Sequence, residues 1–144
     1  MTKDTLPLLS LRDVVYAYPD EDPALRGISV DIRRGERIAV LGNNGAGKST
    51  FFLECNGILR PQEGKLYSAG AEVCYTKKDL IALRKKVGIV FQDADNQIIA
   101  STVESEISFG PMNLRLPLEE VERLVDEAVE RMDLEAYRQR SPQY

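Results

Sequence analysis

A glycine-rich loop between an apolar run and a helix-forming run constrains the fold more than any other feature of the sequence. The loop reads Gly42-Asn-Asn-Gly-Ala-Gly-Lys-Ser49. The run before it, 37–41, is almost wholly apolar, which predicts a strand covered on both faces. The run 48–59 predicts a helix, and Pro61 prevents that helix from continuing. A dry strand that passes through a glycine turn into a helix indicates a mixed α/β core.

The loop also has the composition of an anion site. It satisfies the pattern G-x-x-x-x-G-K-S/T at every fixed position. Glycines let the backbone curl so that successive N–H groups face inward, and the helix that begins near Lys48 adds its positive end. Lys48 can reach the β and γ phosphates, and Ser49 can give its hydroxyl oxygen to Mg²⁺. A chance match is the alternative, but the strand before the loop and the helix after it count against that interpretation.

The first half of the chain is predicted to be rich in β-structure. Residues 8–18 and 28–32 alternate between apolar and polar side chains, which predicts strands with one face toward water. Residues 64–75 predict a hairpin that turns near Gly70. Residues 87–91, Val-Gly-Ile-Val-Phe, predict a second strand buried on both faces. Together these patterns indicate an antiparallel layer in front of a parallel core.

Helical patterns dominate the second half. A short amphipathic helix is expected over 80–86, and another helix over 102–109, which the Gly110-Pro111 pair is expected to break. The strongest helical pattern covers 118–132, where apolar residues recur at spacings of three and four.

Composition excludes several classes of function. The net charge of −4 argues against nucleic acid as a partner, because duplex binding depends on basic surface. The absence of histidine excludes an imidazole base or ligand from this chain. Cys55 and Cys74 form no close-spaced metal or redox pattern. No signal peptide is visible and no run approaches the roughly 18 apolar residues that span a bilayer, so membrane attachment is expected only through another chain.

The residues around the loop resemble one family. Extended through Thr50, the loop takes the form Gly-x-Asn-Gly-Ala-Gly-Lys-Ser-Thr, and residues 18–30 and Phe91-Gln92 match the opening segment and the Q-loop of the nucleotide-binding subunit of ABC transporters. The chain resembles that subunit over nearly its whole length. Within the family, residues 98–133 are most similar to the energy-coupling-factor and cobalt importer ATPases.

The resemblance assigns roles by position. The residues implied to bind ATP are Tyr18, Gly42, Asn43, Asn44, Gly45, Ala46, Gly47, Lys48, Ser49 and Thr50. Tyr18 is implied to stack on the base, which tolerates adenine or guanine, although a plain strand-end tyrosine is the alternative. Gln92 is implied to act in catalysis, as a Mg²⁺ ligand beside Ser49 or by orienting the attacking water, although it also fits a polar strand end. Asp95, Asn96 and Gln97 lie where the family senses its membrane partner, and we interpret them as surface loop.

The resemblance also implies an architecture and partners. The fold is expected to be a P-loop NTPase-like α/β core with an antiparallel β layer at the front, an incomplete core sheet and part of a helical subdomain. Residues 1–98 are expected to form the ATP-binding core, and 99–144 to begin the helical subdomain. The implied partners are a second ATPase subunit and an integral membrane transporter subunit that takes up cobalt or a vitamin-like solute. The implied location is cytoplasmic, on the inner face of the membrane, without direct insertion.

Several family elements are missing from the sequence. It has no Leu-Ser-Gly-Gly-Gln signature, no apolar strand that ends in Asp-Glu, no D-loop after it and no switch histidine. The chain is therefore interpreted as an amino-terminal piece, whether a cloned fragment, a proteolytic product or a truncated gene. We expect ATP binding without meaningful turnover, and self-association through apolar strands that lack neighbours. The alternatives are a small-molecule kinase built on the same loop and a non-enzymatic nucleotide-binding remnant.

Overall fold

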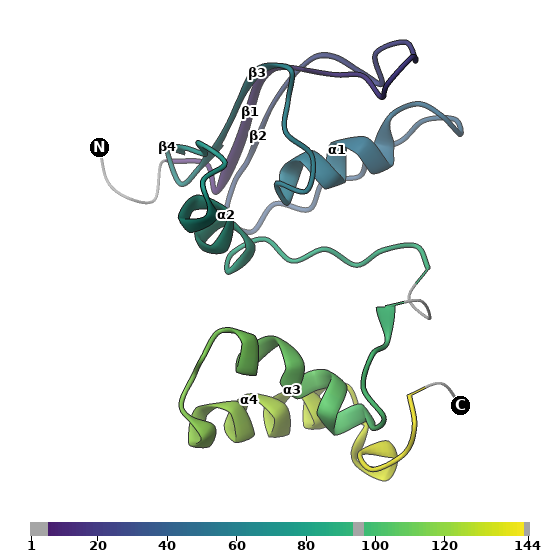
Figure 1. The fold of residues 1–144 in the computed structure, drawn as a ribbon, viewed down its shortest axis with the longest axis vertical. Coiled ribbons are helices and arrows are strands. Elements are labelled where there is room, and N and C mark those ends of the chain that lie inside the picture. Colours follow the sequence, from purple (N-terminus) through teal and green to yellow (C-terminus); the bar gives the residue numbers. More distant parts are fainter. Residues whose placement is uncertain (1–5, 94–96, 143–144) are drawn as a thin grey trace. The chain divides into compact units, whose positions relative to one another are not determined.

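The computed structural model describes residues 6–93 and 97–142. Two compact units divide the chain, Met1–Ile89 and Val90–Tyr144. The first unit holds a β-sheet with two helices, and the second is helical (Figure 1). Each helix in the described part of the chain is too short or too polar to span a bilayer.

The sheet of the first unit is antiparallel and has the order β2-β1-β3-β4. Its strands are β1 (Leu9–Tyr16), β2 (Leu25–Ile32), β3 (Glu63–Ser68) and β4 (Ala71–Glu72). Leu11 on the central strand lies opposite Val30 of β2 and Leu66 of β3. The predicted front layer and the predicted hairpin are therefore present, with the hairpin turning at Gly70.

An irregularity in β1 fixes the identity of one glycine. The register of β1 shifts between Leu11 and Val14 on one side and between Arg12 and Val15 on the other. Gly64 faces this bulge with a φ of 81°, and a Cβ placed on it would lie 2.3 Å from the carbonyl oxygen of Arg12. Only glycine fits, because the backbones of the two strands approach each other too closely for a side chain.

Helix α1 lies beside the sheet and α2 near the end of the sheet that carries β4 (Figure 1), and residues of both helices join its core. Helix α1 (Lys48–Cys55) follows the glycine-rich loop, and α2 (Lys77–Arg84) begins at Thr76, whose side chain accepts a hydrogen bond from the backbone N–H of Asp79. The buried apolar residues of this core are Leu9, Leu11, Val14, Leu25, Phe51, Cys55, Leu66, Val73 and Leu83.

Helix α1 is shorter than the predicted 48–59. It ends because Gly57 adopts a φ of 69°, and its N–H donates to the Glu54 carbonyl at 3.0 Å while the N–H of Ile58 donates to the Leu53 carbonyl at 2.9 Å. This arrangement satisfies the last carbonyls of the helix through a left-handed glycine.

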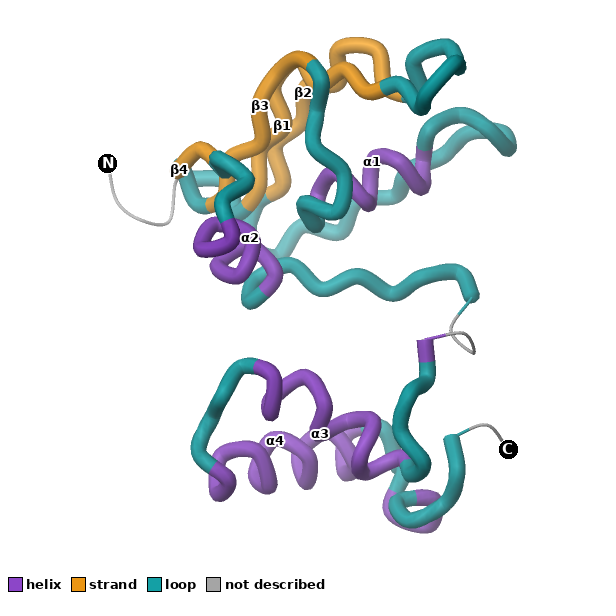
Figure 2. The backbone as a smooth tube through the Cα atoms, in the orientation of Figure 1, coloured by secondary structure: helices purple, strands orange, loops and turns teal. Residues whose placement is uncertain are grey.

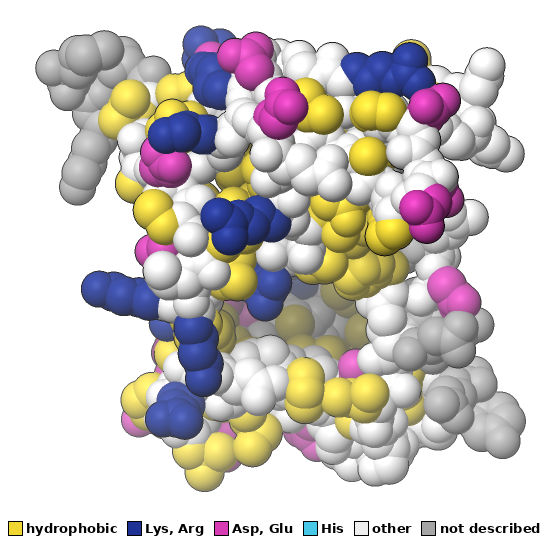
Figure 3. Space-filling view, turned by 45° about the horizontal axis from the view of Figure 1, so that its top comes forward, with side chains coloured by type: hydrophobic (Ala, Val, Ile, Leu, Met, Phe, Trp, Pro, Cys, Tyr) yellow, Lys and Arg dark blue, Asp and Glu magenta, His cyan; other side chains and the backbone are white. Residues whose placement is uncertain are grey.

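The two predicted dry strands, 37–41 and 87–91, are not formed, and that prediction is wrong. Figure 2 colours both segments as loop, and neither pairs with a strand in the described part of the chain. Ile38, Leu41 and Val90 are 46%, 89% and 94% exposed. A parallel strand needs neighbours for its hydrogen bonds, and without them an apolar run remains extended coil. Hydrophobic side chains consequently reach the surface, as the space-filling view shows (Figure 3).

The second unit is built on a pair of helices, α3 (Val103–Asn113) and α4 (Leu118–Arg131). Val121, Val125 and Val129 form the buried stripe of α4, and Ile107 of α3 packs against it. The 3-10 helix η3 (Glu135–Tyr137) follows, and Arg138 then forms ion pairs at 2.7 Å with Glu104 and with Asp126. The predicted amphipathic helix over 118–132 is confirmed with nearly its predicted ends.

The break predicted at Gly110-Pro111 is wrong, because α3 continues to Asn113. A proline hinders the helical conformation of the preceding residue by contacts with the N–H and the Cβ of that residue, and Gly110 lacks the Cβ. Pro111 also lies in the last turn, where only its own backbone donor is lost. The N–H of Leu114 still donates to the Gly110 carbonyl at 3.2 Å, so the turn closes.

Candidate phosphate-binding site

Residues 42–47 form the tight loop that leads into α1. Gly45 and Gly47 have positive φ angles of 82° and 83°, and the N–H of Ala46 donates to the Asn43 carbonyl at 3.2 Å. Alternation of left-handed glycines with ordinary residues gives a curled backbone whose N–H groups can converge on an anion. The loop ends at the N-terminus of α1, a helix with no acid in its first turn, so the positive end of the helix dipole is not neutralised.

Gly47 also contacts β2 through its backbone. A Cβ placed on Gly47 would lie 2.3 Å from the carbonyl oxygen of Ala24 and 3.3 Å from Leu25. The sequence pattern explains glycine here by the curled backbone, and the structure adds a second reason. Since a side chain cannot enter this space, Gly47 lets the start of α1 rest directly on the start of β2.

Lys48 is folded over the loop rather than extended into solvent. Its Nζ atom donates to the carbonyl of Gly42 at 2.8 Å and to the carbonyl of Asn43 at 2.7 Å. An ammonium group has three donors, so one remains for a ligand oxygen while the other two hold the amine in place. The lysine is thereby positioned as a point charge at the rim of the loop.

Ser49 provides the hydroxyl oxygen that fits a magnesium ion. It lies in the first turn of α1 and is exposed. Among the described residues no group of three or more Cys, Asp or Glu side chains could hold a metal ion by itself. A single serine hydroxyl is a ligand that Mg²⁺ accepts, because Mg²⁺ keeps several waters and takes phosphate oxygens with few protein ligands.

Thr50 and Tyr18 connect the first turn of α1 to the end of β1. Their hydroxyl groups are 3.3 Å apart, within hydrogen-bonding distance. Thr50 is buried, and the half-buried Tyr18 ring contacts Tyr16 edge-on, with centroids 5.2 Å apart and an interplanar angle of 84°. The side chain of Thr50 is thus engaged with Tyr18, and these contacts fix the ring beside the helix that carries Lys48.

The remaining predicted site residues belong to the second unit. Gln92 is exposed and lies in the stretch that opens this unit. Gln97 is exposed too, and its Nε2 atom donates to the backbone carbonyl of Asp93 at 2.8 Å. Asp95 and Asn96 lie outside the described residues. The structure therefore brings the loop and Tyr18 together in one unit, and it describes Gln92 with the other unit.

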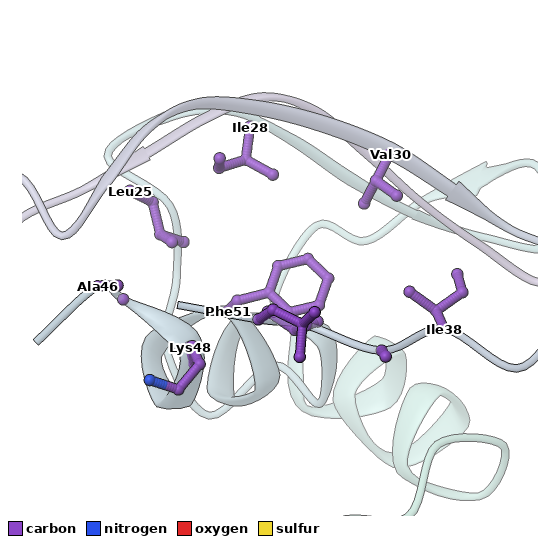
Figure 4. Close-up of a pocket in the computed structure, with 11 residues that line it drawn as sticks. Leu25, Ile28, Val30, Ile38, Ala46, Lys48 and Phe51 are labelled. Atoms are coloured by element: carbon purple, nitrogen blue, oxygen red, sulfur yellow. The ribbon is translucent and has the colours of Figure 1, made fainter. Parts of the chain in front are cut away.

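An apolar pocket of about 400 Å³ adjoins the phosphate loop. Figure 4 shows Leu25, Ile28 and Val30 of β2 on one side and Phe51 of α1 on the other. Ile38 belongs to the unpaired segment 37–41 that lines the same space, and Lys48 lines it from α1 (Figure 4). Segment 37–41, β2 and α1 thus all contribute residues to the wall of the pocket.

One residue of this region was missed by sequence reasoning. Glu54 on α1 is 1% exposed, and neither carboxylate oxygen has a hydrogen-bond partner among the described residues. Burial raises the pKa of its carboxyl group to about 7. The signal in the sequence was that Glu54 is the only charged residue between Lys48 and Arg60, inside a mostly apolar run.

Comparison with known proteins places this geometry in context. The family model described as ABC transporter matches residues 25–144. The energy-coupling factor transporter ATP-binding protein EcfA of Methanothermobacter thermautotrophicus is 51% identical over 137 residues, which are 95% of this chain and 44% of that protein. A protein with the same description from Methanocaldococcus jannaschii is 44% identical over 95% of this chain and 49% of its own length. The chain therefore spans about half the length of the curated relatives it matches.

Solved structures agree with the sequence relatives. The protein cbiO1 from Clostridium perfringens, described as part of the ABC transporter complex cbiONQ, matches with a TM-score of 0.82 at 40% identity, over 94% of this chain and 54% of that one. A dimeric ATP-binding cassette in a post-hydrolysis state, bound to ADP and Pi, matches with a TM-score of 0.77 at 25% identity, over 93% of this chain and 61% of that one. These matches confirm the family resemblance and the fold class that the sequence predicted.

Proposed function

The chain belongs to the ABC transporter family, and on that premise we propose that it binds ATP with Mg²⁺ as part of the ATPase subunit of an importer of the energy-coupling-factor or cobalt type. The observation that carries this proposal is the phosphate loop, whose left-handed glycines and folded lysine provide an anion site at a helix N-terminus. The names of the relatives, an energy-coupling factor transporter ATP-binding protein and a part of an ABC transporter complex, support a transporter subunit.

Each residue of the site has a proposed role. The backbone N–H groups of residues 42–49 cradle the β and γ phosphates, and Lys48 adds its positive charge. Ser49 gives an oxygen to Mg²⁺, and Tyr18 stacks on the base, a contact of about 1–3 kcal/mol. Gln92, from the second unit, either ligates the metal ion or orients the attacking water. We propose that residues 1–98 form the nucleotide-binding part and that 99–144 begin the helical subdomain.

The proposed partners follow from the relatives. One match is described as dimeric and bound to ADP and Pi, and another as part of a transporter complex. We therefore propose that the subunit pairs with a second ATPase subunit and acts on an integral membrane protein, in the cytoplasm at the inner face of the membrane. In such an assembly ATP closes the pair, and this closure moves the membrane partner.

For the 144-residue chain itself we propose binding without meaningful turnover. Phosphoryl transfer depends on a positioned water and on neutralisation of charge in the transition state. The sequence contains no strand ending in Asp-Glu, no signature motif and no histidine to provide these functions. A steady-state ATPase assay with Lys48→Ala as the control tests this proposal, and robust turnover that depends on Lys48 contradicts it.

Nucleotide binding is tested by calorimetry and thermal melting with Mg-ATP. The wild-type chain is expected to bind, and a concentration of 100 times Kd should add about 2.7 kcal/mol of apparent stability. Lys48→Ala should abolish the heat of binding and the stabilisation, whereas Lys65→Ala, a control on β3 that loses only an exposed ion pair with Glu72, should leave both unchanged. Failure of the wild-type chain to bind Mg-ATP overturns the proposed function.

A further inference from the structure

Glu54, on the helix that follows the phosphate loop, is a buried carboxylic acid. It lies one helical turn after Thr50 on α1, the same helix whose N-terminus forms the anion site. Its side chain is 1% exposed, and both carboxylate oxygens lack a hydrogen-bond partner in the described part of the chain. A buried carboxylate without a partner is costly, so the neutral form of this group is favoured.

The groups that face Glu54 do not offset a negative charge. They come from β1 as Tyr16, from the segment before α2 as Tyr75, and from α1 itself as Cys55. Burial is the main cause that raises the pKa of these three groups, and a negative charge on Glu54 is a further cause for each of them. All three are uncharged at neutral pH, so none stabilises an ionised Glu54 by charge.

The cations near this region are used elsewhere. Arg84 of α2 donates to the carbonyl of Gly57 at 3.1 Å, and Arg60 lies over the ring of Tyr75 with its guanidinium carbon 5.5 Å from the centroid. The ion pairs of the described residues do not include Glu54. The carboxyl group is therefore packed without a compensating positive charge.

The distance to the phosphate loop makes this group relevant to nucleotide binding. Glu54 follows Lys48 by six positions on α1, which corresponds to about 9 Å along the helix axis. Side chains on a helix lean toward its N-terminus, here toward the phosphate loop. A triphosphate bound there brings further negative charge toward a group with no counter-ion, so binding disfavours the ionised form of Glu54.

We propose that Glu54 links nucleotide binding to the uptake of a proton, so that the phosphate loop holds ATP more tightly when this carboxyl group is neutral. The proposal rests on the proposed function of the loop. The proton comes from solvent, adds to one carboxylate oxygen of Glu54 when ATP binds, and is released when the nucleotide leaves. Glu54 thus acts as a positioning residue through α1 and does not touch the nucleotide.

Calorimetry in two buffers with different ionisation enthalpies measures this proton directly. At about pH 7, the wild-type chain should take up a fraction of a proton when it binds Mg-ATP. Glu54→Gln should not show this uptake, because the amide has the shape of the carboxyl group but does not titrate. Between about pH 6 and pH 8 the affinity of the wild type relative to Glu54→Gln should fall about tenfold, the factor given by one like-charge pair about 10 Å apart at an effective dielectric constant of about 20. Equal proton uptake in both proteins overturns the proposal.

Two further variants keep the test decisive. Glu63→Gln removes an exposed carboxylate from β3 and should retain the proton uptake and pH profile of the wild type. If Glu54→Gln does not fold, Glu54→Leu provides a second neutral side chain of similar size, and its binding should likewise show no proton uptake from this position. Uptake that is lost in Glu63→Gln, or kept in Glu54→Leu, contradicts the assignment to Glu54.

Melting without nucleotide separates this proposal from the proposed function. The carboxyl group has a pKa of about 7 in the folded chain against an ordinary value of 4.5, so its favourable contribution is complete below 4.5 and is lost as pH rises through about 7. The melting temperature of the wild type relative to Glu54→Gln should therefore be lower at pH 7.5 than at about pH 5. If neither the wild type nor its variants bind Mg-ATP, the proposed function is wrong. If the difference in melting temperature between the wild type and Glu54→Gln does not change with pH, Glu54 does not titrate in this range, whatever the result with nucleotide.

Discussion

The antiparallel layer and the two apolar segments 37–41 and 87–91 differ in whether their apolar side chains are buried. Leu11 and Leu66 of the layer are 0% and 1% exposed, whereas Leu41 and Val90 of the segments are 89% and 94% exposed. The layer forms because β1 to β4 pair with one another inside the first unit. Antiparallel strands find partners through short connections, while parallel strands depend on crossovers that bring the neighbour from far along the chain. Apolar composition therefore predicts burial only where the partner strand is present.

Truncation of one leucine in each region tests the difference between them most directly. Leu11→Ala should lower the free energy of unfolding by about 2–5 kcal/mol, because the side chain is buried in the centre of the core. Leu41→Ala should change it by no more than about 0.5 kcal/mol, because that side chain is already in water. Urea unfolding of the two variants provides the measurement. Equal destabilisation by both contradicts the distinction between the layer and the segments.

The phosphate loop follows segment 37–41 and contacts the start of β2 through Gly47. Gly47→Ala should lower the free energy of unfolding by about 1–2 kcal/mol because alanine is strained at this left-handed φ. The added Cβ must also displace the Ala24 carbonyl, which should cost about 1–3 kcal/mol more. Gly45→Ala is the matched control, because its φ is nearly the same and no atom lies within 4 Å of the added Cβ. Gly45→Ala should therefore lower the free energy of unfolding only by the about 1–2 kcal/mol of backbone strain.

Melting temperatures and Mg-ATP calorimetry measure both effects of the glycine variants. Gly47→Ala should weaken nucleotide binding more than it weakens the fold, because the added methyl group separates the start of α1 from β2. If Gly45→Ala is as destabilising as Gly47→Ala, contact with β2 is not what requires glycine at position 47.

Local chemistry explains which elements the sequence could predict. The stripe of Val121, Val125 and Val129 recurs at four-residue spacing and identified α4, and the turn at Gly70 identified the β3–β4 hairpin. The loop was predicted because its fixed residues each meet a local requirement of backbone or charge. The signals for α4 and for the hairpin depend on residues near one another in the sequence, and both elements are formed.

The features that the sequence did not predict depend on partners far along the chain, or on an adjacent residue that changes the usual effect of a proline. The unpaired segments needed knowledge of the strand beside them, and Pro111 is tolerated in α3 because the residue before it is Gly110. Glu54 is charged, so composition favoured the surface, whereas the packing of α1 on the sheet buries it. The contact between Tyr18 and Thr50 joins residues 32 positions apart and has no local signal in the sequence.

Removal of that contact should have a smaller effect, and it tests how the antiparallel layer positions the site. Tyr18→Phe removes the hydroxyl group 3.3 Å from Thr50 and keeps the ring that contacts Tyr16. We expect a loss of about 0.5–1.5 kcal/mol in the free energy of unfolding, and little change in Mg-ATP affinity. Tyr18→Ala should in addition weaken Mg-ATP binding by about 1–3 kcal/mol if the ring stacks on the base. An unchanged affinity in Tyr18→Ala contradicts the stacking role.

The smallest effect on the fold, and the most informative for the unpaired segments, is expected from Leu41→Lys. Because Leu41 is 89% exposed, the charge should change the free energy of unfolding by no more than about 0.5 kcal/mol. It should nevertheless reduce association, since uncovered apolar strand-like segments pair between chains and a lysine interrupts such pairing. Light scattering should find dimers or larger species for the wild type and a shift toward monomer for the variant. Lys78→Ala on the exposed face of α2 is the control for altered charge. A wild-type chain that stays monomeric at all concentrations would show that these exposed segments do not cause self-association.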